Sequence, residues 1–425
     1  MTAVIGILNK QGVALAADSA VTVIGGNNKK IYNTANKIFT LSKYHPIGIM
    51  VYGSSSFMNT PWEIIIKLYR KEIGDKSFNT VKEYKNDFIK FLKKKNFFTS
   101  KKGQQNFIKQ FIYYNLSAQK ELIIQKLEGQ TDDENELLKE FQEKYKFELE
   151  QIIDSYKDKK NLLKDFSKYT FENFMTFIGK ELNDIIKIVY EGIELTDELN
   201  ELIKKQYYCI LTSKKFIGSN SGLVFSGFGE KEIYPSIISI NVAEAFDDIL
   251  RYYNYNEAEI SDSNNGSIMP YAQKDVIDMF ITGIDPEIDK TYFNIFQETL
   301  TKYHSFIAES IKEIDVKISE KIKSLNIDHI SSEFIKEMNN VKIKLQINPT
   351  VETVSILSKE YLAEMPESLI YLTYLKRRIS SDEESVGGPI DVAIISKGDG
   401  FIWKKRKHYF SQELNRHFMA NYFNK

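Results

Sequence analysis

The sequence predicts an α+β protein built on antiparallel sheets. Strand-like segments come in three groups, and long helical segments separate the groups. The chain lacks the regular alternation of strand and helix that a parallel doubly wound sheet requires. Helices packed on the outer faces of antiparallel sheets fit this order better.

The first fifty residues carry the clearest strand signals. Residues 3–8 and 13–17 are apolar runs of strand length, and the turn residues Asn-Lys-Gln-Gly at 9–12 separate them, which predicts a hairpin. A second pair of strands is expected over 37–41 and 47–52.

Two blocks of the chain are predicted to be helical, from about 76 to 207 and from about 288 to 346. Apolar residues recur there every three or four positions, as in amphipathic helices. In the second block the apolar stripe continues from Phe293 to Leu325, which is typical of long helices that pair with each other. Before the first block, Thr60-Pro61-Trp62-Glu63 combines an N-cap, a proline at the first helical position and a capping-box glutamate, so a helix is expected to begin there.

Composition narrows the class of protein. The 425 residues exceed one typical domain, and 57 Lys and Arg balance 58 Asp and Glu, which disfavours nucleic acid or anionic lipid as a partner of the whole surface. The single cysteine, Cys209, excludes an internal disulfide framework, and the five histidines show no metal-ligand spacing. There is no apolar run of membrane-spanning length and no basic start of a signal peptide. We expect a cytoplasmic protein without cofactor, metal or membrane partner.

Thr2 is the first candidate for chemistry. Initiator methionine is normally removed before a small second residue, so the mature chain is expected to carry an α-amine and a hydroxyl on Thr2. An α-amine with a pKa of about 8 can take the proton of the hydroxyl and make it a nucleophile. A Met-Thr start alone is common, however, and most such starts carry no catalysis.

The residues that follow strengthen this interpretation. Asp18 comes directly after the first hairpin, Lys37 heads the next strand, and Gly53 ends the strand that pairs with it. This order resembles that of proteasome β-subunits and their bacterial relatives among the N-terminal-nucleophile (Ntn) hydrolases.

Later segments resemble the same superfamily. Residues 385–395, Ser-Val-Gly-Gly-Pro-Ile-Asp-Val-Ala-Ile-Ile, are similar to its Ser-x-Gly-Gly-x-Ile-Asp-Val strand, and Gly-Asp-Gly-Phe at 398–401 matches the turn after it. Residues 223–228 and 233–240 look like its central pair of strands. The resemblance covers roughly half of the chain, and the two helical blocks have no counterpart.

On this resemblance the chain is identified as a bacterial-type member of the proteasome β-subunit-like Ntn hydrolase superfamily with large helical insertions. The implied fold is a four-layer αββα sandwich of antiparallel sheets. Its core would comprise residues 2–75, 208–287 and 347–425, with a helical insertion over 76–207 and a helical hairpin over 288–346.

The resemblance also implies roles for four residues. The Thr2 hydroxyl would attack an amide carbonyl while its amine shuttles the proton. The charge of Lys37 would lower the pKa of the hydroxyl, Asp18 would hold Lys37, and the backbone N–H of Gly53 would bind the oxyanion. The alternative is that Asp18 is a solvated turn residue and Lys37 a surface lysine.

The sequence departs from the pattern of the superfamily at two points. The loop before Lys37 is longer, so Lys29 or Lys30 is an alternative for the catalytic lysine; we favour Lys37 because it directly precedes the strand. The later aspartate and serine that help to hold the terminal amine do not map cleanly, and Glu383 and Gln273 are the expected substitutes.

The leading hypothesis is a threonine-nucleophile amidohydrolase, a proteasome-like peptidase acting on peptide or other amide substrates; a non-peptidase amidase stays open. The alternative is a catalytically silent scaffold that recruits a protein partner through its helical insertions. A homo-oligomer is expected in either case. The basic run Lys404–His408 is interpreted as a solvated strand end or partner contact rather than a phosphate site.

Overall fold

The computed structural model describes residues 3–25, 28–94, 100–127, 133–380, 386–411, 413–417 and 420. It confirms an α+β protein with antiparallel sheets. The chain divides into two compact units. The first contains residues 1–50, 226–237 and 258–425, and the second contains residues 51–225 and 238–257. The division into a core and two insertions remains a prediction.

One five-stranded sheet lies entirely in the first unit, in the order β12-β1-β2-β13-β14. All of its strand pairs for which a register is defined are antiparallel, and the predicted hairpin of β1 and β2 is confirmed, with Asn9 opposite Gly12. Its strands are β1 (Val4–Asn9), β2 (Gly12–Ala17), β12 (Gly266–Ala272), β13 (Asp391–Ser396) and β14 (Gly400–Lys405).

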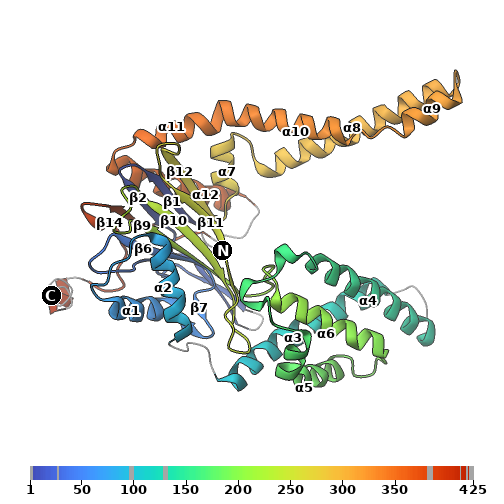
Figure 1. Cartoon of the computed structure of the whole chain (residues 1–425), viewed down its shortest axis with the longest axis horizontal. Helices are drawn as coiled ribbons and strands as arrows, with labels where there is room; N and C mark the ends of the chain where they lie inside the picture. The colour runs from blue at the N-terminus through green and yellow to red at the C-terminus, as the bar shows by residue number, and fades with distance from the viewer. Residues whose placement is uncertain are drawn as a thin grey trace. The chain divides into compact units, whose positions relative to one another are not determined.

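Three helices cover one face of this sheet (Figure 1). They are α7 (Asp275–Thr282), α11 (Asn348–Ile356) and α12 (Lys359–Ile379). Because side chains alternate between the faces of a strand, Ala3, Ile5 and Ile7 all point towards these helices. Their burial with Leu369 and Ile370 of α12 fixes the register of β1 and the position of its first residues.

The second sheet has the order β11-β10-β9-β6-β5, and its strands contribute residues to both units. Two short hairpins lie outside the two large sheets. The strands of the sheet are β5 (Ile38–Thr40), β6 (Ile47–Gly53), β9 (Ser221–Gly227), β10 (Ser236–Val242) and β11 (Tyr252–Glu259). The hairpins pair β3 (Val21–Gly25) with β4 (Asn28–Tyr32), and β7 (Ser56–Phe57) with β8 (Thr60–Pro61).

The second unit is mainly helical, and α3 to α6 bury a common apolar core that includes Leu149 and Leu182. The predicted capping box at Thr60 is wrong: α1 begins at Trp62 without a side-chain cap, because Thr60 and Pro61 form β8 instead. The helices are α1 (Trp62–Ile73), α2 (Val81–Lys94), α3 (Lys101–Leu127), α4 (Glu134–Tyr156), α5 (Phe171–Val189) and α6 (Asp197–Thr212), with 3₁₀ turns at Lys159–Asn161 and Lys164–Phe166.

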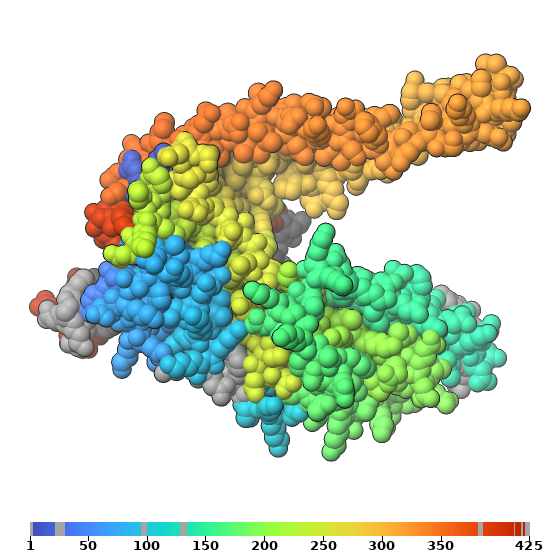
Figure 2. All heavy atoms as spheres, in the orientation of Figure 1, coloured from blue at the N-terminus to red at the C-terminus, as the bar shows by residue number. Residues whose placement is uncertain are grey.

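Residues 286–347, here called the arm, form a long and thin helical hairpin of the first unit (Figure 2). The expected continuous stripe is broken, because Asp315 caps a new helix with its side chain. Phe296 and Phe334 stack across the hairpin at a centroid distance of 3.9 Å. The arm contains α8 (Pro286–Lys312), α9 (Val316–Lys323), α10 (Asp328–Lys342) and a π-helical turn (Ile343–Ile347), and a 3₁₀ turn follows near the end of the chain (Glu413–Asn415).

No helix within the described residues is long and apolar enough to cross a membrane.

Candidate active site

A buried carboxylate connects the start of β1 to Lys37. Asp18 follows β2, is 1% exposed, and donates its backbone N–H to the carbonyl of Ala3 at 3.1 Å. Its Oδ1 accepts hydrogen bonds from the backbone N–H of Ala3 at 2.9 Å and from Nζ of Lys37 at 2.6 Å. The residue directly after Thr2 and the ammonium of Lys37 therefore share one oxygen atom. Asp18 is thus a buried anchor and not a solvated turn residue.

Lys37 directly precedes β5 and is 6% exposed. Its Nζ also donates to the carbonyl of Ala20 at 2.6 Å. Burial lowers the pKa of Lys37, although the carboxylate of Asp18 acts to raise it. Lys37 is therefore a buried lysine held by a carboxylate and not a surface lysine. Lys30, by contrast, is exposed on β4.

The loop before β13 completes the site around Asp18. Oδ2 of Asp18 accepts from the backbone N–H of Ala20 at 3.0 Å and of Gly387 at 3.2 Å. Ser19 binds the same loop, because its N–H donates to the carbonyl of Gly387 at 3.1 Å and its hydroxyl donates to the carbonyl of Pro389. Three backbone amides and one ammonium therefore hold the carboxylate, so its orientation is fixed before any substrate binds.

The structure describes only two of the four other predicted site residues. Thr2 and Glu383 lie outside the described residues. Gly53 belongs to the second unit and has a φ of +78°, and a Cβ there would lie 2.5 Å from the carbonyl oxygen of Asn220, so backbone conformation and packing already require glycine. Gln273 has a φ of +51°, and its Oε1 accepts from Nε of Arg377 at 2.8 Å. The roles predicted for these four residues remain predictions.

A second buried ion pair was not predicted from the sequence. Asp391, 2% exposed, lies at the start of β13 opposite Ala17, the residue before Asp18. Both of its carboxylate oxygens bind Lys407: Oδ1 accepts from the backbone N–H at 2.8 Å and Oδ2 accepts from Nζ. Lys407 belongs to the basic run for which a solvated strand end or a partner contact is expected, and for this residue the solvated alternative is wrong. A buried aspartate inside a strand is the signal that would have found the pair.

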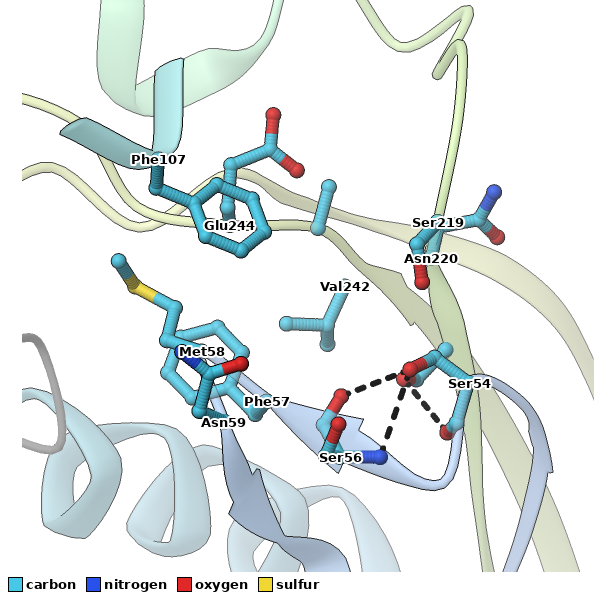
Figure 3. A pocket seen from close by; sticks show the side chains of 12 residues that line it. Ser54, Ser56, Phe57, Met58, Asn59, Phe107, Ser219, Asn220, Val242 and Glu244 are labelled. Carbon is cyan, nitrogen blue, oxygen red and sulfur yellow. Dashed lines mark hydrogen bonds between the residues drawn. The ribbon is translucent and has the colours of Figure 1, made fainter. Parts of the chain in front are cut away.

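A pocket of about 260 Å³ lies within the second unit (Figure 3). Phe57, Met58 and Phe107 form an apolar wall, and Ser54 and Ser56 lie on the other side. Met58 and Asn59 have positive φ because they form the two-residue turn between β7 and β8. The Ser54 hydroxyl donates to the carbonyl of Ser56 at 2.9 Å. Glu244 also lines the pocket, and its carboxylate is paired with Arg251.

Among the described residues there is no group of three or more His, Cys, Asp or Glu side chains that could hold a metal ion.

Comparison with known proteins gives only distant similarities. No family model matches the chain, and no curated protein matches it. A solved structure of an Anbu (Gly-1) mutant from Hyphomicrobium sp. strain MC1 is 10% identical, with coverage of 99% of this chain and 95% of that chain and a TM-score of 0.27. Anbu (ancestral beta-subunit) from Yersinia bercovieri is 8% identical, with coverage of 99% and 94% and a TM-score of 0.29. Such values support no conclusion about activity.

These findings correct one expectation. The identification of the chain as a bacterial-type member of the proteasome β-subunit-like superfamily is wrong, because no family model matches it and its similarity to the two Anbu structures is very low. The resemblance rests on the order of Thr2, Asp18, Lys37 and Gly53 around two hairpins, on the Ser-x-Gly-Gly-x-Ile-Asp-Val segment with the turn after it, and on a central pair of strands. Turn and strand chemistry of this kind recurs in unrelated antiparallel folds. Function must therefore be argued from the site itself.

Proposed function

We propose that this chain is an amidohydrolase whose nucleophile is the hydroxyl of Thr2, and that peptide bonds are its main substrate class. The observation that carries the proposal is the shared oxygen of Asp18, which binds both Nζ of Lys37 and the backbone N–H of Ala3, next to Thr2. The proposal includes the four-layer αββα arrangement of sheets and helices and the oxyanion role of the Gly53 amide. It requires Thr2 to be the first residue of the mature chain.

The chemistry follows from the groups available. Oγ of Thr2 attacks the carbonyl carbon of an amide, its proton passes to the α-amine through water, and the amine of the leaving group then takes that proton. Water hydrolyses the resulting ester. An ammonium has three N–H donors, and Lys37 uses two of them on Asp18 and Ala20. We assign the third to Oγ of Thr2, where a positive charge stabilises the alkoxide.

Intact mass spectrometry tests this proposal. We expect the purified protein to lack Met1 and to gain the mass of a small β-lactone, with the adduct on Thr2. Thr2→Ala should fold normally and show neither labelling nor amide hydrolysis, because it keeps the amine and loses the nucleophile. Full retention of Met1, or equal labelling of Thr2→Ala, would contradict the mechanism.

A second candidate function is an interaction module, and exposed apolar side chains on the arm favour it. Tyr303 and Phe306 of α8 are large apolar side chains, and they are 61% and 65% exposed. Deletion of residues 288–346 tests this candidate. We expect the deletion to change the number of subunits per assembly, measured by light scattering, and to leave labelling of Thr2 by the small β-lactone intact. A folded deletion variant with the same number of subunits as the full chain would remove the support for this candidate.

A further inference from the structure

The site around Lys37 contains a second ion pair with no assigned role. Asp391 and Ala17 are opposite each other in the antiparallel pair of β13 and β2, so the backbone of Asp391 lies beside the residue that precedes Asp18. After β14 ends at Lys405, the chain passes the start of β13 and brings Lys407 to Asp391. Four charged side chains, on Asp18, Lys37, Asp391 and Lys407, thus lie within one buried region.

The two pairs are not independent of each other. Lys407 acts electrostatically to lower the pKa of Lys37, and Asp391 acts to raise it. The side chains of Asp391 and Lys407 are only 3% and 12% exposed, so water screens their charges weakly. Arg406 and His408 flank Lys407 in the chain and are exposed; burial and Arg406 lower the pKa of His408, and Asp391 acts to raise it.

We propose that Asp391 and Lys407 are positioning residues of the candidate site, a second ion pair that holds the start of β13 beside Ala17 and whose two charges act on the ammonium of Lys37. Lys407 touches Asp391, and neither is assigned a contact with the substrate. As a role in catalysis this inference rests on the proposed function, whereas the effect on Lys37 does not. The opposite charges of the two residues give opposite predictions, which a merely structural ion pair would not produce.

The test is a titration of Lys37 by NMR. Lysines are labelled with ¹³C at Cε, and the Lys37 resonance is identified by its absence from Lys37→Arg. We expect the midpoint of the Lys37 titration to shift upwards in Lys407→Met, because a nearby positive charge is lost and Asp391 is left uncompensated. It should shift downwards in Asp391→Asn, where Lys407 stays charged. In Lys407→Arg the Lys37 midpoint should equal that of the wild-type protein, because the positive charge is kept.

Lys404→Met is the matched control, because Lys404 is an exposed lysine of the same basic run. It should leave the Lys37 midpoint unchanged. If Asp391→Asn does not fold, the comparison of Lys407→Met with Lys407→Arg still shows whether the charge of Lys407 acts on Lys37. An unchanged Lys37 midpoint in folded Lys407→Met would overturn the inference.

The role in catalysis has a separate readout. The pH profile of Thr2 labelling by the β-lactone should shift in the same direction as the Lys37 midpoint in each variant. A shifted midpoint with an unshifted labelling profile would overturn the positioning role. Complete absence of labelling in the unchanged protein would contradict the proposed function instead, and the NMR titration would still decide whether the pair acts on Lys37.

Discussion

Asp18–Lys37 and Glu244–Arg251 are both almost fully buried ion pairs, but their surroundings differ. Asp18 binds three backbone amides and the ammonium. Glu244 and Arg251 lie seven residues apart around the connection between β10 and β11. Arg251 donates from Nη2 to the carbonyl of Ile210 at 3.2 Å and lies over the ring of Phe216 at 4.9 Å.

The difference shows that burial of a charge pair does not by itself indicate catalysis. The contacts of Arg251 join a turn to the end of α6, which is a structural role. Asp18 instead connects the residue after Thr2 to a lysine with one further donor. A buried pair is weak evidence of stability and stronger evidence of function when a reactive group lies beside it. Four predictions test this contrast.

The largest effect is expected for Lys37→Ala. Amide hydrolysis should fall by about 10²–10⁴-fold, because the charge that stabilises the alkoxide is lost. Lys37→Arg should not rescue it, since the forked guanidinium cannot place a compact charge at the same point. Initial rates on a peptide substrate measure the effect, with circular dichroism to verify folding. Wild-type rates in Lys37→Ala would show that Asp18–Lys37 is as structural as Glu244–Arg251.

Arg251→Met should affect stability rather than chemistry. It leaves Glu244 buried without a partner, so the free energy of unfolding should fall by about 3–5 kcal/mol. Urea denaturation measures this loss. Labelling of Thr2 per folded molecule should stay at the wild-type level. Loss of labelling in the folded fraction would contradict a purely structural role for the pair.

A double variant that replaces both partners of an ion pair should affect stability differently in the two pairs. Glu244→Leu with Arg251→Met should recover most of the stability lost in Arg251→Met, since no buried charge remains. Asp18→Leu with Lys37→Met should not recover, because the amides of Ala3, Ala20 and Gly387 lose their acceptor, at about 1–3 kcal/mol each. Denaturation curves of both double variants provide the comparison. Equal recovery would mean that these amides find other partners.

The fold was most predictable where turn chemistry fixes the backbone. The hairpin of β1 and β2 follows from the Asn-Lys-Gln-Gly turn, and Asn9 pairs with Gly12 across it. Strand β11 was missed because Tyr252–Glu259 is largely polar and exposed, so it lacks the apolar alternation of a half-buried strand. The helix expected to have Pro61 at its first position begins one residue later, at Trp62, because Thr60 and Pro61 pair with β7 instead of capping it.

The two helical blocks show a second limit of prediction from the sequence: the spacing of apolar residues does not predict their burial. Both carry apolar residues at helical spacing, yet Leu149 in α4 is fully buried and Tyr303 in the arm is 61% exposed. Periodicity reports which side chains share a face, and it does not report what covers that face. The basic run likewise predicts a solvated strand end or a partner contact at Lys407, because charge alone does not show that the pairing of β13 with β14 brings this lysine to Asp391.

The smallest effect is expected for Lys30→Ala. The sequence left Lys29, Lys30 and Lys37 as alternatives for the active lysine, because the loop after Asp18 is long. Lys30 is exposed and pairs with Val23 in a two-stranded hairpin, whereas Lys37 is buried against Asp18.

Replacement of an exposed strand residue usually changes the free energy of unfolding by no more than about 0.5 kcal/mol. Hydrolysis should stay within about twofold of wild type, since a solvent-screened charge contributes little at a distance. The rate assay used for Lys37→Ala measures hydrolysis by both lysine variants, and urea denaturation measures the stability of Lys30→Ala. If Lys30→Ala lost activity and Lys37→Ala kept it, the lysine of the β3–β4 hairpin would be the functional one, and the Asp18–Lys37 pair would become a structural anchor of β1.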